Sequence, residues 1–176
     1  MNGIIIIDKP QNYTSFDIIA ILRKKFNQKK IGHMGTLDPM ATGVLPVLLG
    51  DTAKFQIFTE NKDKEYIAKM EFGLTTDTLD STGNILSTSS QKVTEKSFLK
   101  DIENFLGKIK QIPPMFSAIK QNGKKLCDLA RKGIEVERKK REVVIKNIDV
   151  ISFDEKTQTA VVKVKCSAGT YIRTLC

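Results

Sequence analysis

The stretch from Gly32 to Pro46 constrains the fold more than any other part of the chain. It reads GHMGTLDPMATGVLP and holds three glycines and two prolines in fifteen residues. Glycine admits positive φ, whereas proline fixes φ and disfavours the helical region for the residue before it. Asp38 precedes Pro39, so we expect it in an extended or turn conformation within a stiff loop. The apolar segment 44–49 that follows predicts a strand, which would mount this loop on a rigid element.

Two interpretations compete for Asp38. In one, its carboxylate caps local backbone N–H groups of a turn, which is the ordinary role of the acid in a Leu-Asp-Pro tripeptide. In the other, it is a catalytic carboxylate. The whole stretch favours the second, because it resembles the active-site motif G-H-x-G-T-L-D-P-x-A-T-G-x-L-P of the TruB-type tRNA pseudouridine synthases. Such a long match is specific. Met34 stands where threonine is common in that family.

The composition favours a polyanionic partner. The 176 residues suffice for one domain with a real core, and their formal net charge is +9. An excess of Lys and Arg favours nucleic acid or an anionic membrane. The chain lacks an apolar run of about 18 residues, so no transmembrane helix is expected. The start lacks signal-peptide features, and Cys127, Cys166 and Cys176 have no metal-ligand spacing. We therefore expect a reduced, cytoplasmic protein.

Hydrophobic periodicity predicts alternating strands and helices. Tyr66 shares a strand face with Ala68 and is expected to point inward, while Cys166 is expected to be buried. Thr14 or Ser15 can cap the first helix. The expected strands are 3–8, 44–49, 64–73, 142–153 and 159–167. The expected helices are 15–26, 52–58, 94–106 and 126–133, with an exposed loop at 77–91 and an extended segment at 111–120.

Further segments resemble other motifs of the same family, in family order. Residues 8–15 resemble D-K-P-x-G-x-T-S, with Asn12 in the glycine position. Because asparagine tolerates positive φ better than most residues, we expect this turn to be kept. The other matches are 64–66 to K-x-Y, 73–80 to G-x-x-T-x-T-x-D, 111–120 to Q-x-P-P-x-x-S-A-x-K, and 166–175 to C-S-x-G-T-Y-I-R-x-L. Cys127 stands where the family usually has a tyrosine, so a stacking contact with RNA is not expected there.

The resemblance implies isomerisation of uridine to pseudouridine at position 55 in the T-loop of tRNA. In this reaction the N1–C1′ bond breaks, the uracil turns, and it rejoins the sugar through C5. The resemblance makes Asp38 the catalytic carboxylate, which attacks the sugar, attacks the base, or assists elimination to a glycal. Tyr66 would stack under the uracil and act as a base. Arg173 would hold Asp38 ionised; alternatively, it is an ordinary surface arginine.

The remaining candidates concern RNA binding. The target uridine must be flipped out of its stack, and His33 would fill the gap that it leaves. Leu175 would line the uracil pocket and Lys9 would support the site. The alternatives are a structural histidine at 33 and a solvated loop lysine at 9. The other residues predicted to contact RNA are Gly35 and Thr36 in the central motif, and Lys120 and Arg131 in a basic segment that ends in the run 138–141.

The fold implied by the resemblance is α/β, of the α+β type, with a central mixed, largely antiparallel sheet flanked by helices. We expect residues 1–176 to form one pseudouridine synthase catalytic domain. The family would continue past Cys176 with more of this domain and a PUA-like domain, so we expect a truncated chain. No cofactor or metal is expected. The expected partner is the T stem-loop of tRNA, with no membrane, and the expected state is a monomer.

Two other functions are weighed against the synthase. The first is a noncatalytic RNA-binding module on the same scaffold, which the presence of Asp38, Tyr66 and Arg173 disfavours. The second is a hydrolase that uses Asp38 and His33. Their spacing within a loop rich in glycine and proline gives no evident geometry for a base and a nucleophile, and no third orienting residue is apparent.

Overall fold

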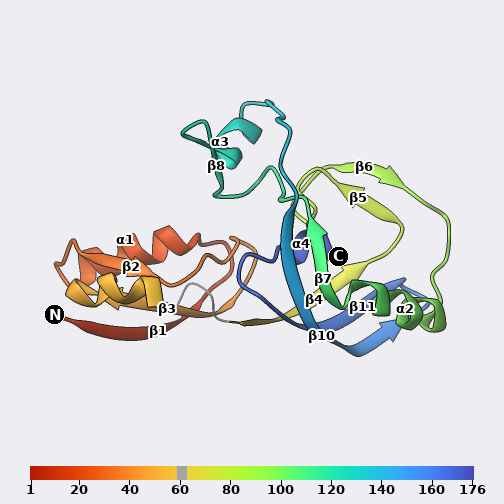
Figure 1. The fold of residues 1–176 in the computed structure, drawn as a ribbon, viewed down its shortest axis with the longest axis horizontal. Helices are drawn as coiled ribbons and strands as arrows, with labels where there is room; N and C mark the ends of the chain where they lie inside the picture. The colour runs from red at the N-terminus through yellow and green to blue at the C-terminus, as the bar shows by residue number, and fades with distance from the viewer. Residues whose placement is uncertain (59–62) are drawn as a thin grey trace. The chain divides into compact units, whose positions relative to one another are not determined.

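The computed structural model describes residues 1–58 and 63–176, and the chain divides into two compact units. The first unit is Met1–Lys62 and the second is Asp63–Cys176. Every strand pair in the described residues is antiparallel, and helices accompany the sheets in both units (Figure 1). The predicted α/β class with largely antiparallel strands is therefore confirmed. None of the helices in the described ranges has the length and apolar character needed to cross a bilayer.

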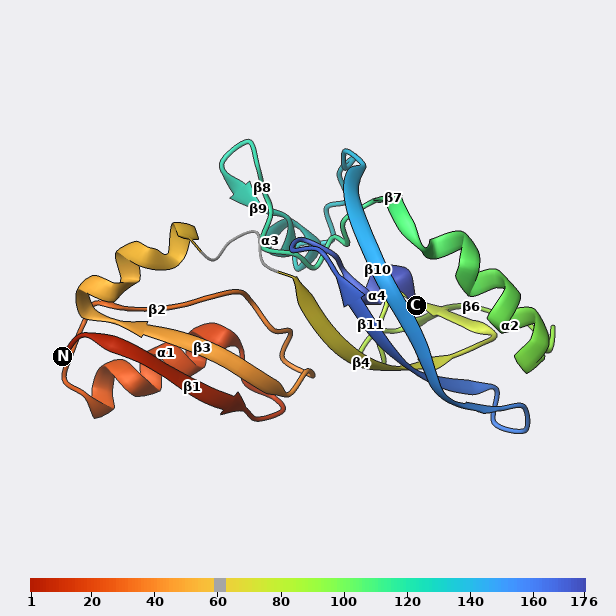
Figure 2. The ribbon, with the colours of Figure 1, turned by 60° about the horizontal axis from the view of Figure 1, so that its bottom comes forward.

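The first unit is a three-stranded sheet with one helix packed against it. The strand order is β1-β3-β2, and Figure 2 shows the helix α1 lying against this sheet. A short core joins the two layers, with Ile19, Leu45 and Val47 at most 1% exposed. The elements are β1 (Gly3–Lys9), α1 (Ser15–Lys25), β2 (Ile31–His33), β3 (Gly43–Leu49) and the 3-10 helix η1 (Gly50–Phe58).

Helix α1 begins where its capping residues predict. The Thr14 hydroxyl accepts a hydrogen bond from the Asp17 amide at 3.0 Å, and the Asp17 carboxylate accepts one from the Thr14 amide at 2.8 Å. This reciprocal pair is a capping box, which satisfies two amides that the helix itself leaves unpaired. Ser15 is thereby the first helical residue and its side chain turns inward, where only 2% of it is exposed.

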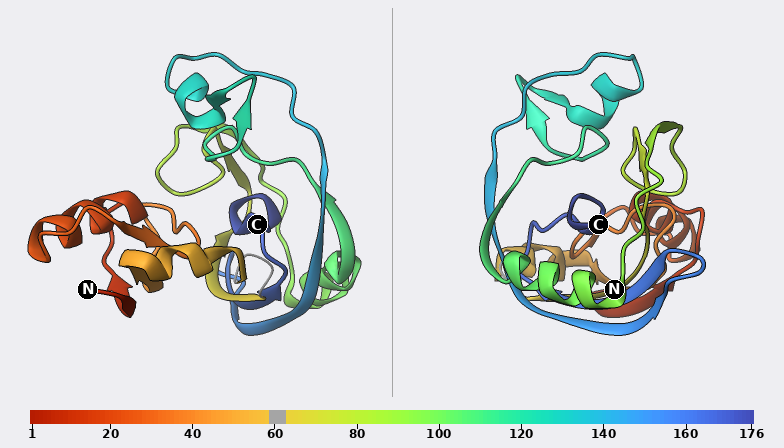
Figure 3. Two further views of the ribbon diagram at one scale, coloured as in Figure 1. Left: turned by 60° about the vertical axis from the view of Figure 1, so that its left-hand side comes forward. Right: turned by 90° about the vertical axis from the view of Figure 1, so that its right-hand side faces the viewer.

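The second unit is built on a four-stranded sheet in the order β4-β11-β10-β7. Two smaller hairpins, β5–β6 and β8–β9, lie outside this sheet. Figure 3 shows β8, β9 and α3 standing apart from the four-stranded sheet of their own unit. The strands are β4 (Lys64–Glu71), β5 (Leu74–Thr76), β6 (Ile85–Thr88), β7 (Gly107–Gln111), β8 (Lys120–Gln121), β9 (Lys124–Lys125), β10 (Arg141–Asp154) and β11 (Thr159–Cys166). The helices are α2 (Glu95–Ile102), η2 (Glu103–Phe105), α3 (Leu126–Ala130) and α4 (Ile172–Leu175).

The core of the second unit lies between the sheet and α2. The rings of Phe72, Phe98 and Phe153 pack with centroids 5.1 to 5.7 Å apart. Cys166 is fully buried, as predicted, and burial raises the pKa of its thiol. A thiol held in its neutral form is a poor nucleophile, so Cys166 serves as a small apolar residue of this core.

Most of the predicted elements are confirmed, but three differ. The region 77–91 is not all loop, because Ile85–Thr88 pairs with Leu74–Thr76 as a hairpin. All four residues of β6 are exposed, so this strand lacks the alternation of apolar and polar residues by which a strand is predicted. The predicted helix 94–106 is shorter and ends in a 3-10 turn. The predicted helix 52–58 is a 3-10 helix that begins at Gly50.

Candidate active site

Asp38 lies in the loop between β2 and β3, and this loop is closed by its own backbone. The Met34 amide donates to the Pro46 carbonyl at 2.9 Å, and the Ala41 amide donates to the Asp38 carbonyl at 3.0 Å. Asp38 itself is half-buried. The residues before and after it are held by a second segment, 9–15, which comes from the first predicted motif.

Lys9 supports the Asp38 loop through its side-chain ammonium. Its side chain is fully buried, and its Nζ donates to the carbonyls of Pro10 at 2.9 Å, Tyr13 at 2.7 Å and Pro39 at 3.3 Å. The interpretation of Lys9 as a solvated loop lysine is therefore wrong. Burial lowers the pKa of the Lys9 ammonium, and the negative charges of Asp38 and Asp17 partly oppose this shift.

Asn12 and Ser15 hold the backbone on both sides of Asp38. The Asn12 amide donates to the Pro39 carbonyl at 2.8 Å, and Asn12 has φ +68°, which confirms the expected left-handed turn. The Ser15 hydroxyl accepts from the Leu37 amide at 2.9 Å and donates to the Leu37 carbonyl at 3.2 Å. Sequence reasoning treated Ser15 only as a possible helix cap. Its position as the last residue of D-K-P-x-G-x-T-S is the feature of the sequence that could have indicated this second role.

We expect Ser15→Ala to lower the turnover number about tenfold while tRNA affinity changes less than threefold. Without the hydroxyl, both Leu37 backbone groups lose a partner, and small misplacements of a catalytic group are costly. Thr14→Ala is the matched control, because it removes the helix cap at a cost of about 1 kcal/mol but leaves the Leu37 contacts in place. Single-turnover rates at saturating protein would make the comparison. Equal rates for both variants would show that Ser15 does not position the loop.

His33 is tied to the same loop. It ends β2, and its Nδ1 lies 2.5 Å from the Gly35 carbonyl. A carbonyl only accepts hydrogen bonds, so Nδ1 carries the proton in this contact and Nε2 is the other ring nitrogen available to a ligand. Gly35 has φ +102°, a conformation that favours glycine. Gly35 and Thr36 are both exposed, as RNA-contacting residues must be.

In the second unit, Tyr66 and Leu175 pack against the same core. Tyr66 lies on β4 and Leu175 ends α4, and both are partly buried against the cluster around Val164 and Cys166. The expected inward orientation of Tyr66 is confirmed, since Ile67 next to it is 69% exposed. An aromatic ring and an aliphatic side chain beside one core can offer an apolar surface to a base.

Arg173 joins three segments of the second unit. Its side chain is 12% exposed, and it donates to the Thr78 carbonyl at 3.1 Å, the Asp80 carboxylate at 3.3 Å and the Phe116 carbonyl at 2.9 Å. The interpretation of Arg173 as an ordinary surface arginine is therefore wrong. Asp80, the last residue of the motif 73–80, was not singled out from the sequence.

The Asp80 carboxyl is held ionised by its neighbours. Its side chain is 8% exposed, and this burial opposes ionisation. Hydrogen bonds from Thr82 and Thr78, together with the charge of Arg173, outweigh burial and hold the pKa of Asp80 below its usual range. A buried ion pair with this many partners fixes the guanidinium in place.

Gln111 fixes the start of α4, the helix that carries Arg173. Its side-chain amide is buried and makes two hydrogen bonds to Tyr171, one from Nε2 to the carbonyl at 3.3 Å and one to Oε1 from the amide at 3.1 Å. Tyr171 is the residue before α4. Gln111 is the first residue of the Q-x-P-P motif, and this position is the only feature of the sequence that points to a role for its side chain.

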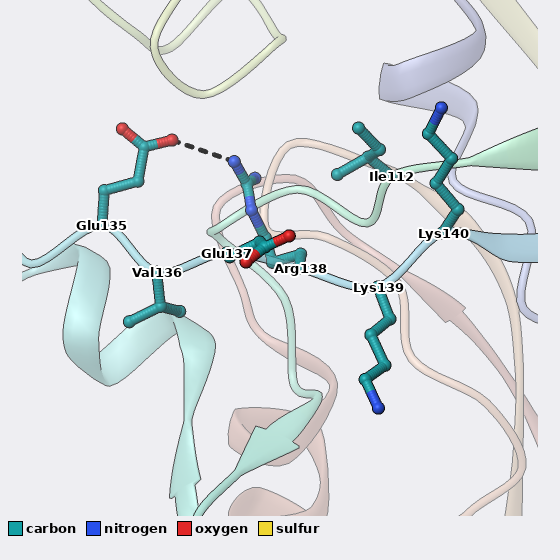
Figure 4. A pocket seen from close by; sticks show the side chains of 7 residues that line it. All are labelled: Ile112, Glu135, Val136, Glu137, Arg138, Lys139 and Lys140. Carbon is teal, nitrogen blue, oxygen red and sulfur yellow. Dashed lines mark hydrogen bonds and ion pairs between the residues drawn. The ribbon is translucent and has the colours of Figure 1, made fainter.

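The predicted basic segment is exposed in part. Lys120 on β8 and Arg131 after α3 are both exposed, and Arg131 lies 3.6 Å from the Asp128 carboxylate. Arg138 differs, because it donates to the Pro113 carbonyl at 3.1 Å and pairs with Glu135 at 2.9 Å. Figure 4 shows this pair in a shallow pocket lined by Ile112 and residues 135–140, with the side chains of Lys139 and Lys140 extending in different directions.

The candidate residues are distributed over both units. Lys9, His33, Gly35, Thr36 and Asp38 lie in the first, where they share one loop and its support. The second unit holds Tyr66, Lys120, Arg131, Arg173 and Leu175. The pairing of Arg173 with Asp38 is predicted across the two units and stays a prediction. Within residues 1–58 and 63–176, no group of three or more His, Cys, Asp or Glu could hold a metal ion.

The fold is that of the pseudouridine synthases. It matches the crystal structure of a Cbf5-Nop10-Gar1 complex with a TM-score of 0.71 and 29% identity, over 98% of this chain and 42% of that one. A second match, to an H/ACA RNP bound to a substrate RNA containing 2′-deoxyuridine, has a TM-score of 0.67 and 26% identity, over 98% of this chain and 40% of that one.

Sequence comparison then gives the family. The model of the N-terminal domain of TruB family pseudouridylate synthases matches residues 23–172, so the chain belongs to the TruB family. It is 51% identical to tRNA pseudouridine synthase B of Clostridium tetani, over 100% of this chain and 61% of the relative. It is 47% identical to the synthase of the same name from Endomicrobium trichonymphae, over 99% of this chain and 76% of the relative. The chain spans about three fifths of the length of the relatives from Clostridium tetani and Clostridium kluyveri.

Proposed function

We propose that the protein isomerises uridine to pseudouridine at position 55 in the T-loop of tRNA. The observation that carries the proposal is the identity of 51%, over the whole chain, to a protein named tRNA pseudouridine synthase B. The supported Asp38 loop is consistent with it, because a carboxylate that attacks a sugar or base must be held with little freedom.

The mechanism that we propose begins with a flipped-out uridine. Its extraction from the T-loop stack costs about a few kcal/mol, and His33 fills the space that it leaves. Tyr66 stacks on the uracil and Leu175 lines the pocket. Asp38 then attacks the sugar, attacks the base, or assists elimination to a glycal, and the N1–C1′ bond breaks. The uracil turns and rejoins the sugar through C5, and any bond that Asp38 formed to the sugar or the base breaks. Tyr66 removes the proton from C5, or a sugar proton on the glycal route, and N1 ends protonated.

Each remaining candidate has a role in this proposal. Arg173 holds Asp38 ionised, and Lys9 supports the loop through its contact with the Pro39 carbonyl at 3.3 Å. Gly35, Thr36, Lys120 and Arg131 contact the RNA. The net charge of +9 supports an RNA partner. We propose a cytoplasmic monomer in which residues 1–176 belong to one catalytic domain.

Release of tritium tests the function. When uridine labelled at C5 becomes pseudouridine, C5 bonds to the sugar and its tritium exchanges into water. We expect the protein to release tritium from labelled tRNA, with no release from position 55 when cytidine replaces uridine there. A folded protein that binds tRNA but releases no tritium would be a noncatalytic RNA-binding module instead.

A further inference from the structure

One basic surface of the first unit has no role in the proposed chemistry. Five cations occur between Arg23 and Lys30, with no acid among these eight residues. They lie in the last turn of α1 and in the turn that leads to β2. We call them the α1 basic cluster; its members are Arg23, Lys24, Lys25, Lys29 and Lys30.

Three lysines of the cluster are exposed without a neutralising partner. Lys30 pairs with Asp51 at 2.5 Å, and Arg23 donates to the Ile31 carbonyl at 3.1 Å. Lys24, Lys25 and Lys29 are exposed, and no carboxylate of the described residues lies within ion-pair distance of them. Their charges therefore project into solvent and are available to a polyanion.

Helix stability accounts for only part of this cluster. Cations in the last turn of a helix interact favourably with its dipole, which explains Lys24 and Lys25. Lys29 lies beyond the end of α1 and gains nothing from this effect. The surface also carries an aromatic ring: Phe16 is 61% exposed, and the Arg23 guanidinium lies 5.6 Å from its centroid. Cations beside an exposed ring are typical of RNA-contacting surfaces.

The cluster is held at a fixed distance from the Asp38 loop. The first residue of α1, Ser15, bonds to Leu37 next to Asp38, and the cluster is at the other end of this helix of 11 residues. At about 1.5 Å per residue the helix is about 16 Å long. Ile19 and Leu22 fix it on the core of the first unit. A folded tRNA that presents its uridine to Asp38 is longer than this helix, so it can reach the cluster at the same time.

We propose that the α1 basic cluster binds phosphates of the same tRNA that presents its uridine to Asp38. This inference rests on the proposed function for the identity of the RNA. The cluster is a second RNA-contacting surface, separate from the segment that contains Lys120 and Arg131. Phosphate contacts carry no sequence information, so its role is to fix the orientation of the tRNA on the first unit.

The test is the salt dependence of tRNA binding by a variant with Lys24→Gln, Lys25→Gln and Lys29→Gln. Each phosphate contact that is lost reduces the slope of log affinity against log salt by about 0.7 to 0.9. We expect a reduction of about 2 and an affinity about tenfold lower at moderate salt. Tritium release at saturating tRNA should stay within twofold of the parent, because no residue of the Asp38 loop is altered.

A variant with Lys92→Gln, Lys96→Gln and Lys100→Gln is the matched control. It removes the same charge from three exposed lysines in and beside α2, and Lys100 also lies in the last turn of its helix. We expect its slope to equal that of the parent. The proposal would be overturned if the salt-dependence slopes of all three proteins were equal, or if both variants lost the same tRNA affinity. If the Lys24, Lys25 and Lys29 variant shows the expected slope reduction but the parent releases no tritium, this inference is kept and the proposed activity is removed.

Discussion

The Asp38→Asn variant is expected to lose at least about 10³-fold in turnover while its tRNA affinity changes less than threefold. The substitution keeps the shape of the side chain and removes the charge that every proposed route needs. The loop backbone should persist, because the Ser15 hydroxyl, the Asn12 amide and the Lys9 ammonium hold it and are unchanged in this variant. Tritium release under single-turnover conditions, with filter binding beside it, measures both quantities.

Asp51→Asn is the matched control for this variant. It removes one exposed carboxylate from the same unit, and it breaks the surface pairs with Lys30 and Lys54. Such pairs contribute little to stability, so both turnover and affinity should stay near those of the parent. Turnover by Asp38→Asn at more than a tenth of the parent rate would contradict the assignment of Asp38 as the catalytic carboxylate.

Sequence patterns predicted the local features of the Asp38 loop. The two prolines and three glycines predicted a stiff loop, and the asparagine at position 12 predicted a left-handed turn, which is present. The alternation around Tyr66 predicted which side of β4 faces the core. These features depend on residues close in sequence, whose steric limits are the same in any fold.

The supporting contacts could not be predicted from such patterns. Ser15 meets Leu37 across 22 residues, Gln111 meets Tyr171 across 60, and Arg173 meets Asp80 across 93. Periodicity shows that a polar side chain faces inward, but it does not show which partner it meets there. Two properties are shared by the polar residues of these pairs: their side chains are largely buried, and they belong to motifs of the family. These residues are Ser15, Gln111, Asp80 and Arg173. A buried polar group needs a partner, so motif residues of this kind are good candidates for positioning roles.

The Arg173→Gln variant is expected to lose stability as well as activity. Removing the guanidinium leaves Asp80 buried without its cation and leaves the carbonyls of Thr78 and Phe116 without this donor. Breaking a buried ion pair on one side costs about 3 kcal/mol. We also expect at least a hundredfold loss of turnover, since the proposed orientation of Asp38 depends on this group. Urea unfolding at pH 7 and tritium release measure the two effects.

The pH dependence of unfolding separates the ion pair from a simple packing defect. The pKa of Asp80 is below its usual range in the folded parent, so its ionised form stabilises the fold at neutral pH, and this contribution is lost as the pH falls through the folded value. Without Arg173 the pKa of Asp80 rises, so Arg173→Gln should start to lose stability at a higher pH than the parent. Arg173→Lys keeps the charge but not the planar guanidinium. It should therefore restore the stability at acid pH more than it restores the activity. If the parent and Arg173→Gln lose stability over the same range of acid pH, the pKa of Asp80 does not depend on Arg173.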